Sequence, residues 1–346
     1  MDERTDIVDP LEHAGWDDWV LSCPTSTIFH TTAWARVLVE AFRYRPIYMC
    51  RMAGDKPTAC LPVMEMDSFL TPRKAKALPF TDFCDVIAEG DPPTDLLLDA
   101  ALEYGRTRGW TTLELRGGTI DESAPHVGTC YGHTVSLAPG PDEVFSSFQS
   151  STRRNIKRAQ KQGVRVRHEH SFQAVRDYYR LHVITRKRHG LFVQPFALFR
   201  NIFEHIVARG HGFVVLAALG ERPVAGALYF HSRDRGVFAY GASDKAYQHL
   251  RPNNLVMWHA IQWFGEHGYT VLDLGITDAS NRGLRRYKNG MATDERVLHY
   301  YKYSFGSQQF LAEPGATMRS LRTAMCRHMP LWLLRGVGTL LYKHHG

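Results

Sequence analysis

The residues of this chain with the clearest chemical character are its lysines and arginines, which gather in two segments. Positions 151–190 hold twelve Lys or Arg against two Asp or Glu, and positions 316–346 hold five against none. Because the whole chain has a net charge of +7, the remaining residues carry an excess of eight negative charges. Localised basic segments favour contact with phosphates, nucleic acid or lipid headgroups, although a solvated helix face produces the same pattern.

The first basic segment begins with positions 151–164, which read STRRNIKRAQKQGV. At helical spacing, Ile156 and Ala159 can face a core while the cations project outward. We therefore expect this helix to bind phosphate through Arg153, Arg154 and Lys157.

Other reactive residue types form no recognisable centre. The six cysteines are scattered without a CxxC pair, which favours reduced, buried thiols over disulfides or zinc. The 18 histidines include no HExxH motif and no paired ligand spacing. We expect no protein-bound metal.

The elements that position these residues occur twice along the chain. Residues 101–115 and 260–274 share Ala, Gly, Thr and two Leu at an offset of 159, and residues 54–59 and 220–225 match at an offset of 166. Two matches in the same order predict two copies of one domain. Glu114 in the first copy corresponds to Asp273 in the second. Asp273 can serve as a general base or accept a structural hydrogen bond, and its counterpart favours an architectural acid.

Hydrophobic periodicity predicts a mixed α/β fold of the α+β kind. We expect helices at 13–22, 31–42, 94–108, 142–162, 171–189, 195–209 and 252–267, and a helix or loop at 281–288. We expect strands at 46–52, 58–66, 111–116, 131–137, 164–168, 212–219, 223–232, 236–242, 271–274 and 296–305, with a loop over 67–82. The predicted domains are 1–140 and 141–313, each a mostly antiparallel sheet flanked by helices, followed by an amphipathic helical tail at 314–346.

Several motifs resemble one known group of enzymes. They are residues 151–164 (STRRNIKRAQKQGV), 185–190 (TRKRHG), 220–226 (GERPVAG), 240–243 (YGAS), 252–255 (PNNL), 273–275 (DLG) and 283–288 (GLRRYK), with 29–34 (FHTTAW) and 79–82 (PFTD) in the first half. This pattern resembles the Fem-type peptidyl and aminoacyl transferases and their BioF2-like relatives among the GNAT acyltransferases. The resemblance spans nearly the whole chain and implies two GNAT-like domains in tandem.

The same resemblance implies an activity and a set of site residues. It implies transfer of an acyl or aminoacyl group to an amine of a cell-envelope precursor, of peptidoglycan or polysaccharide type. Lys288 looks like the family's catalytic lysine, and a fixed cation there would stabilise the negative charge on the carbonyl oxygen. Asp273 is the second catalytic candidate. The remaining positions that the resemblance implies for substrate binding are Trp34, Arg186, Arg188, Tyr240, Asn253, Asn254, Arg285 and Tyr287.

One loop bears on the acyl donor. GNAT enzymes that bind acetyl-CoA carry a Gly-containing loop before a helix, whose backbone N–H groups hold the pyrophosphate. At the equivalent place this chain has residues 248–254, QHLRPNN, in which neither glycine is present. We expect no permanently bound cofactor, and both aminoacyl-tRNA and acyl-CoA remain open as co-substrates. An acetyl-CoA-dependent N-acetyltransferase is thus an alternative.

The expected partners follow from the two basic segments. They are a phosphate-bearing small-molecule or lipid-linked substrate, tRNA, and an anionic membrane surface contacted through residues 316–346, which could equally dock on the body of the protein. The first residues, MDERTD, do not resemble a secretory signal, and no run approaches the roughly 18 apolar residues of a membrane span. We expect a cytoplasmic protein, with peripheral attachment to the inner membrane face if the tail binds lipid. A non-catalytic RNA- or membrane-binding member of the fold is a further alternative.

Overall fold

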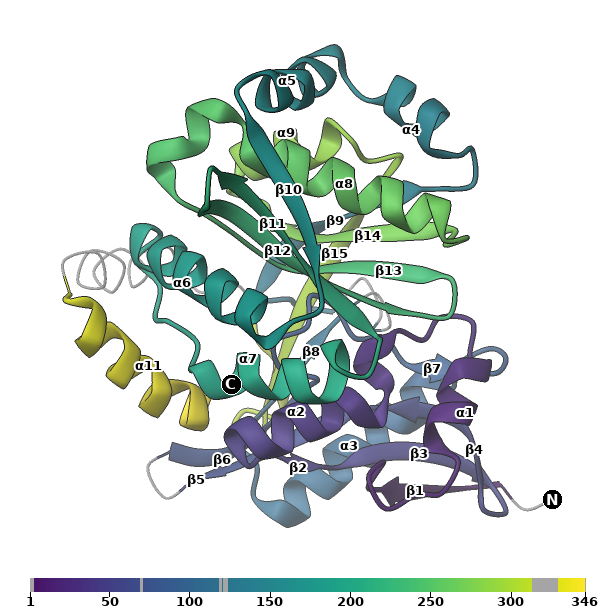
Figure 1. The fold of residues 1–346 in the computed structure, drawn as a ribbon. Helices are drawn as coiled ribbons and strands as arrows, with labels where there is room; N and C mark the ends of the chain where they lie inside the picture. Colours follow the sequence, from purple (N-terminus) through teal and green to yellow (C-terminus); the bar gives the residue numbers. More distant parts are fainter. Residues whose placement is uncertain (1–2, 69–70, 118–119, 121–123, 313–328, 346) are drawn as a thin grey trace. The chain divides into compact units, whose positions relative to one another are not determined.

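The computed structural model describes residues 3–68, 71–117, 120, 124–312 and 329–345 (Figure 1). The chain forms two compact units that interleave along the sequence. Unit 1 comprises Met1–Cys130, Val297–Gly315 and Leu340–Gly346, and unit 2 comprises Tyr131–Arg296 and Ala316–Thr339. The predicted linear division at 140 and 313 therefore differs from the observed one, because the strand after position 293 continues from unit 2 into unit 1.

Unit 1 contains two sheets with the strand orders β1-β3-β4-β7 and β15-β8-β6-β5-β2. All pairings between their named strands are antiparallel except that of β6 with β8. The elements of this unit are β1 (Glu3–Val8), α1 (Trp16–Ser22), η1 (Ile28–His30), α2 (Thr32–Phe42), β2 (Arg45–Pro46), β3 (Tyr48–Ala53), β4 (Lys56–Leu61), β5 (Val63–Ser68), β6 (Thr71–Ala77), β7 (Ile87–Ala88), α3 (Thr94–Arg108), β8 (Thr112–Arg116), the start of β9 (Gly128–Ser136), most of β15 (Asp294–Ser304), β16 (Gln309–Phe310) and the end of α11 (Leu331–His345).

Strands β1 and β6 of unit 1 were not expected from the sequence. The predicted loop at 67–82 is wrong over β6, which pairs with β5 on one side and β8 on the other. The acidic first residues also form a strand, β1, against β3. In both cases, pairing with a distant segment outweighs the polar local sequence.

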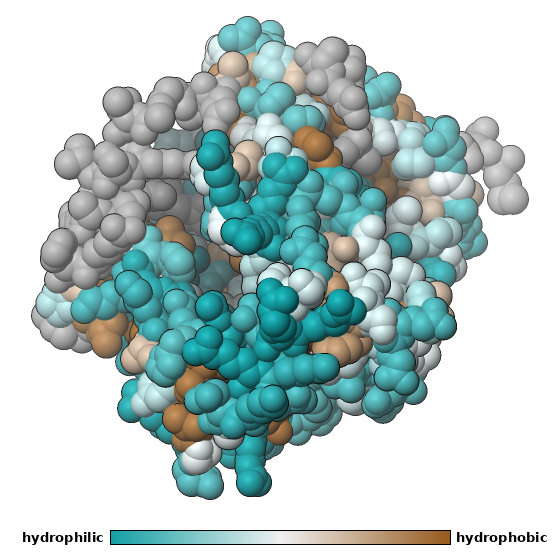
Figure 2. All heavy atoms as spheres, turned by 90° about the horizontal axis from the view of Figure 1, so that it is seen from above, coloured by the Kyte–Doolittle hydropathy of each residue, from teal (hydrophilic) through white to brown (hydrophobic). Residues whose placement is uncertain are grey.

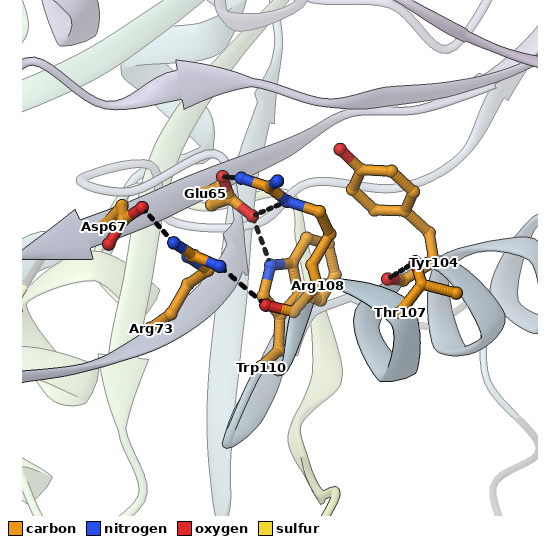
Figure 3. Close-up of polar contacts among 7 residues, drawn as sticks. All are labelled: Glu65, Asp67, Arg73, Tyr104, Thr107, Arg108 and Trp110. Atoms are coloured by element: carbon orange, nitrogen blue, oxygen red, sulfur yellow. Dashed lines mark hydrogen bonds and ion pairs between the residues drawn. The ribbon is translucent and has the colours of Figure 1, made fainter.

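A buried polar network joins α3 to the sheet of unit 1 (Figure 3). Glu65 on β5 is 1% exposed and accepts hydrogen bonds from the Arg108 guanidinium at 2.9 and 3.2 Å and from Trp110 Nε1 at 2.6 Å. Arg73 donates to the backbone carbonyl of Arg108 at 2.8 Å. The end of α3 is therefore fixed to β5 and β6, and with it the start of β8.

Unit 2 has the strand order β10-β11-β12-β13-β14-β9. Helices α8 and α5 lie on one face of this sheet, and α6 lies on the other (Figure 1). Its elements are most of β9, α4 (Pro141–Ser147), α5 (Ser150–Lys161), β10 (Val164–Glu169), α6 (Phe172–Arg188), α7 (Phe196–Ile202), η2 (Phe203–Val207), β11 (Gly212–Leu219), β12 (Arg222–Ser232), β13 (Arg235–Ser243), η3 (Lys245–Leu250), α8 (Pro252–Glu266), β14 (Val271–Asp278), α9 (Arg282–Asn289) and the starts of β15 and α11.

The core of unit 2 explains why the predicted helix at 142–162 is two helices. Phe148 has extended backbone angles between α4 and α5, and its side chain is 3% exposed. Its ring packs edge-on against Trp258 of α8 at 5.6 Å. Burying this ring interrupts the helix.

The two sequence echoes fall on equivalent elements. Residues 54–59 and 220–225 both hold a hairpin turn, between β3 and β4 and between β11 and β12. Residues 101–115 and 260–274 both hold a helix followed by a strand, α3–β8 and α8–β14. The mixed α/β architecture and the repeated order of elements are therefore confirmed.

The described part of the tail is helix α11. Within unit 2, Leu334 is fully buried and Gly338 lies against the backbone of Val193 so closely that an added Cβ would come within 2.1 Å of its carbonyl oxygen. Residues 331–339 therefore dock on the protein. Residues 313–328 of the predicted tail lie outside the described residues. No helix in the described part of the chain has the length and apolar character needed to cross a bilayer.

Candidate active site

Helix α9 carries a buried lysine. The helix begins at Asn281, whose side chain accepts a hydrogen bond from Leu284 N at 3.1 Å, and Lys288 lies at its other end. Lys288 is 3% exposed, and its Nζ donates to the carbonyl oxygen of Ile276 on β14 at 2.6 Å. The sequence thus places one ammonium group in the interior of unit 2, directed at β14.

The strand that Lys288 contacts separates from its neighbour. Strands β13 and β14 run parallel and pair only at their first residues, the last pair being Val237 with Asp273. Beyond that pair β13 stays bonded to β12 through Ser243. The register between β13 and β14 therefore ends before Ile276, which lies three residues farther along β14 than Asp273.

A polar network surrounds the base of Lys288. Arg285 forms a two-bond ion pair with Glu295, at 2.6 and 2.9 Å, and Asn289 donates to the same carboxylate at 2.8 Å. The hydrogen bonds from Arg285 are the largest influence on Glu295 and hold its pKa at about 2. The guanidinium of Arg285 also stacks over the ring of Tyr131 at 3.5 Å. These contacts fix α9 to β9 and β15.

His133 is the buried titratable group of this network. It is 1% exposed, its Nδ1 lies 3.6 Å from Glu295, and neither ring nitrogen has a hydrogen-bond partner among the described residues. Burial, followed by the positive charge of Lys288, lowers the pKa of His133. The lowered pKa keeps the imidazole mostly neutral near pH 7.

A second set of side chains converges on Ser243 at the end of β13. Arg188 Nη1 donates to its carbonyl oxygen at 3.1 Å, and Asn253 Nδ2 donates to its hydroxyl at 3.3 Å. Thr185 exchanges two hydrogen bonds with its backbone, at 2.9 and 3.1 Å. Tyr287, next to Lys288, donates to the carbonyl oxygen of Asn253 at 2.9 Å. The ends of α6 and β13 and the start of α8 are therefore joined, with α9 bonded to α8.

Asp273 makes a local contact. Its Oδ1 accepts a hydrogen bond from Gly275 N at 2.6 Å, and the carboxylate is 6% exposed. Gly275 has a φ of 73°, a conformation that favours glycine. The carboxylate therefore stabilises a bend in β14, where that strand leaves β13.

The remaining predicted substrate-binding residues have other surroundings. Arg186 Nε donates to the carbonyl oxygen of Phe192 at 2.9 Å, the ring of Tyr240 packs on Phe199, and Asn254 is 7% exposed at the start of α8. Trp34 belongs to unit 1 and is fully buried.

The predicted phosphate-binding residues lie on α5. Ile156 and Ala159 of this helix are buried, and Arg154 and Lys157 are exposed. Arg153 is half-buried and donates to the carbonyl oxygen of Ser146 at 2.7 Å. Figure 2 views the side on which α5 lies in Figure 1, and hydrophilic residues cover much of it.

Several residues of the observed networks, Ser243, His133 and Glu295 among them, were absent from the sequence prediction. Ser243 lies within one of the motifs that support the family resemblance, so its position could have been singled out. His133 and Glu295 carry no sequence signal, because they come from strands β9 and β15, which flank the rest of unit 2 in the sequence.

Comparisons with known proteins agree with this fold. Residues 146–289 match the model of the acetyltransferase (GNAT) domain family. Among solved structures, FemX is 14% identical, with 88% of this chain and 98% of that one aligned at a TM-score of 0.63. No curated protein matches this chain.

Two further solved structures share the fold. The C-terminal domain of a putative lysylphosphatidylglycerol synthetase from Agrobacterium fabrum is 15% identical, covering 84% of this chain and 91% of that one at a TM-score of 0.54. A tandem GNAT protein from the clavulanic acid biosynthesis pathway is 9% identical, covering 88% and 98% at 0.53. The match over residues 146–289 and these likenesses show that the chain has a GNAT-like fold, which FemX and the tandem GNAT protein share.

Proposed function

We propose that this protein transfers an acyl or aminoacyl group to an amine, with Lys288 stabilising the developing oxyanion. The supporting observation is the buried ammonium of Lys288, bonded to Ile276 at the point where β13 and β14 separate. In aminolysis, the amine nitrogen bonds to the acyl carbon and negative charge builds on the carbonyl oxygen. The carbon–sulfur or carbon–oxygen bond to the donor then breaks, and the amine loses a proton. A fixed cation in a site of low dielectric constant favours that charge distribution.

The separated strands suggest how the donor lies. Beyond Val237 and Asp273 the register between the two strands ends, and we infer that an extended donor chain lies between them. A donor arm in this position would bring its carbonyl group to β14 beside Lys288. The neutral imidazole of His133 is our candidate for the proton acceptor, acting through water because it is buried.

The start of α8 suggests how the donor's phosphates are held. Pro252 has no N–H to offer, and the side-chain amides of Gln248 and Asn253 both donate to the Ser243 hydroxyl. Exposed Lys245 and Arg251 flank this turn. We therefore infer a phosphate-bearing donor that is recognised by cationic side chains more than by a glycine-rich backbone.

The acceptor that we propose is an amine of a cell-envelope precursor. The shared fold with FemX and with a protein named for lysylphosphatidylglycerol supports this proposal. The basic residues of α5 fit an acceptor that carries phosphate, whether nucleotide-linked or lipid-linked.

A second candidate is an acetyl-CoA-dependent N-acetyltransferase, favoured by the description of the matching domain family. Thermal shift assays with acetyl-CoA and with aminoacyl-tRNA distinguish the two donors. A rise in melting temperature with acetyl-CoA alone favours this second candidate.

Replacing Lys288 with Met tests the proposal. Turnover is measured with acetyl-CoA and aminoacyl-tRNA as donors, and with nucleotide-linked and lipid-linked peptides as amine acceptors. We expect the variant to remain folded and to lose roughly 100- to 1,000-fold in kcat. Arg286→Ala, an exposed position on the same helix, is the matched control and should keep the wild-type rate. Full turnover of the folded Lys288 variant would contradict the proposal.

A further inference from the structure

Unit 1 contains a charged cluster that the proposed acyl transfer does not use. In the strand register, Lys76 of β6 and Lys302 of β15 both lie opposite Glu114 of β8. Lys76 Nζ is 3.0 Å from Glu114 Oε2, and Lys302 Nζ is 3.1 Å from Oε1. Because directly paired residues share a face of the sheet, the three side chains form one row across three strands.

The row borders a pocket of about 440 Å³, within the size range of small-molecule sites. Its polar lining consists of Glu114, Arg116 and Lys302. The rest of its lining is apolar or aromatic: Leu115, Val127, Tyr300, Tyr301, Leu311 and Ala312.

Cations outnumber acids on this face of the sheet. Lys76 has a side chain only 8% exposed, Lys74 is half-buried on the same strand, and both Arg116 and Lys302 reach the pocket. Glu114 is the carboxylate in the row. Two further acids, Asp82 and Asp85, lie toward the Arg116 end, where Tyr300 donates to the Asp82 carbonyl and Asp85 lies against Gly117.

The cations at the pocket keep hydrogen-bond donors available. Among the described residues, Lys302 makes one ion pair, with Glu114, which leaves two of its three ammonium hydrogens for a ligand. Arg116 Nη1 donates to the carbonyl oxygen of Thr81, and the guanidinium lies over the ring of Tyr300 at 5.1 Å. Its remaining N–H groups suit a carboxylate or a phosphate. At pH 7 the row is ionised, because burial lowers the pKa of Lys76 only to about 8 and the lysines hold that of Glu114 at about 2.

The duplicated copy shows that this arrangement is specific to unit 1. Glu114 and Asp273 occupy equivalent places in the repeat, each on a strand paired in parallel with its neighbour. Asp273 is opposite Val237 and bonds to the backbone of Gly275, whereas Glu114 is opposite a lysine. A purely architectural acid would not require two lysines beside it.

We propose that this pocket is an anion-binding site, which takes a carboxylate or phosphate group joined to a short apolar chain. Arg116 and Lys302 contact the anionic group, and the buried Lys76 adds to the positive electrostatic potential there. Leu311 and Val127 contact the apolar part. This site is independent of the acyl transfer proposed for unit 2.

Calorimetric titration of the full chain tests the proposal. The probes are octanoate and octyl phosphate, which distinguish the two anionic groups, with octanol as the uncharged control. We expect at least one of the two anions to bind with an affinity that falls as salt is added, and octanol to bind more weakly by about tenfold or more. Equal binding of octanol, or no binding of either anion, would overturn the proposal.

Variants locate the binding to this pocket. Leu311→Glu places a negative charge in the lining of the pocket, and Leu311→Gln has nearly the same size without the charge; the half-buried position should tolerate both. We expect the Glu variant to weaken anion binding by about tenfold or more relative to the Gln variant. Lys302→Met should also weaken it, whereas Lys56→Met, at an exposed ion pair elsewhere in unit 1, should not. Unchanged affinity in folded Leu311→Glu and Lys302→Met would place the ligand elsewhere and refute the site.

Discussion

Replacing Glu114 with Gln tests the charge balance inside unit 1. Partial burial raises the pKa of Glu114, but Lys76 and Lys302 outweigh that effect and lower the pKa from its usual 4.5 to about 2. A shift of this size corresponds to roughly 3 kcal/mol, which we reduce to about 2 kcal/mol because about a third of the side chain is exposed.

Lys76 adds to the cost of the substitution. Its burial lowers its pKa to about 8, so its charge at pH 7 already opposes folding, and the Glu114→Gln change would remove the carboxylate that offsets it. We expect E114Q to lower the free energy of unfolding by about 2–3 kcal/mol. The double variant K76M/E114Q should lose less than E114Q alone, because it no longer contains the buried charge of Lys76 without its carboxylate partner. Lys302→Met, at a position one-third exposed, should cost about 1 kcal/mol or less.

Urea unfolding, followed by hydrogen exchange of peptides from β6 and β8, reports on unit 1 separately from unit 2.

The lowered pKa of Glu114 also determines how stability depends on pH. The contribution of Glu114 is fully present above about pH 4.5 and is lost as the pH falls toward 2, so wild type and E114Q should converge over that window. If the losses in free energy of unfolding caused by K76M and by E114Q simply add in the double variant, the reasoning is refuted. An E114Q free energy of unfolding within about 0.5 kcal/mol of the wild-type value would refute it as well.

Three further substitutions test other contacts. Asp273→Asn keeps an acceptor for Gly275 N, so we expect the melting temperature and most of the turnover to survive; a large rate loss without unfolding would show that the charge itself takes part. His30 is buried and its pKa is lowered to about 4, so wild type should lose stability as the pH falls from about 6.5 to 4, and His30→Gln should flatten that part of a melting-temperature profile. Gly338→Leu cannot fit against the Val193 backbone, so limited proteolysis should cleave residues 329–339 faster than in wild type, and an unchanged cleavage pattern would argue against the docked helix.

The local sequence pattern predicts much of the fold, but it does not predict strands whose charged residues pair with residues distant in the sequence. The inward positions of α5, Ile156 and Ala159, follow helical spacing, and both are buried. Strand β6 has lysines at positions 74 and 76, a composition that is typical of exposed loops. The burial of Lys76 is compensated by Glu114, which lies opposite it on another strand. Nothing near Lys76 in the sequence indicates that partner.

The candidate site shows the same division. Lys288 could be singled out because it lies in a motif that resembles a known family, and the structure places it against β14. Its neighbours His133 and Glu295 could not be, because the strands that carry them are brought to α9 only by folding. The role of Arg285 changes accordingly: its guanidinium is occupied by Glu295 and Tyr131, which suits positioning of α9 better than direct substrate binding.

The two copies show how one frame can hold two kinds of site. The acid at the equivalent position differs by one methylene group, and that length decides what it reaches. Asp273 bonds to its own strand at Gly275, where β14 leaves β13, and Lys288 contacts Ile276 just beyond this point. Glu114 reaches the neighbouring strands, where it forms ion pairs with the buried Lys76 and with Lys302, which lines the pocket. In the second copy the acid shapes the backbone, and in the first it balances cations. The cation that we assign to catalysis therefore comes from the helix after the repeated strand in unit 2, whereas the cations of unit 1 come from the sheet itself.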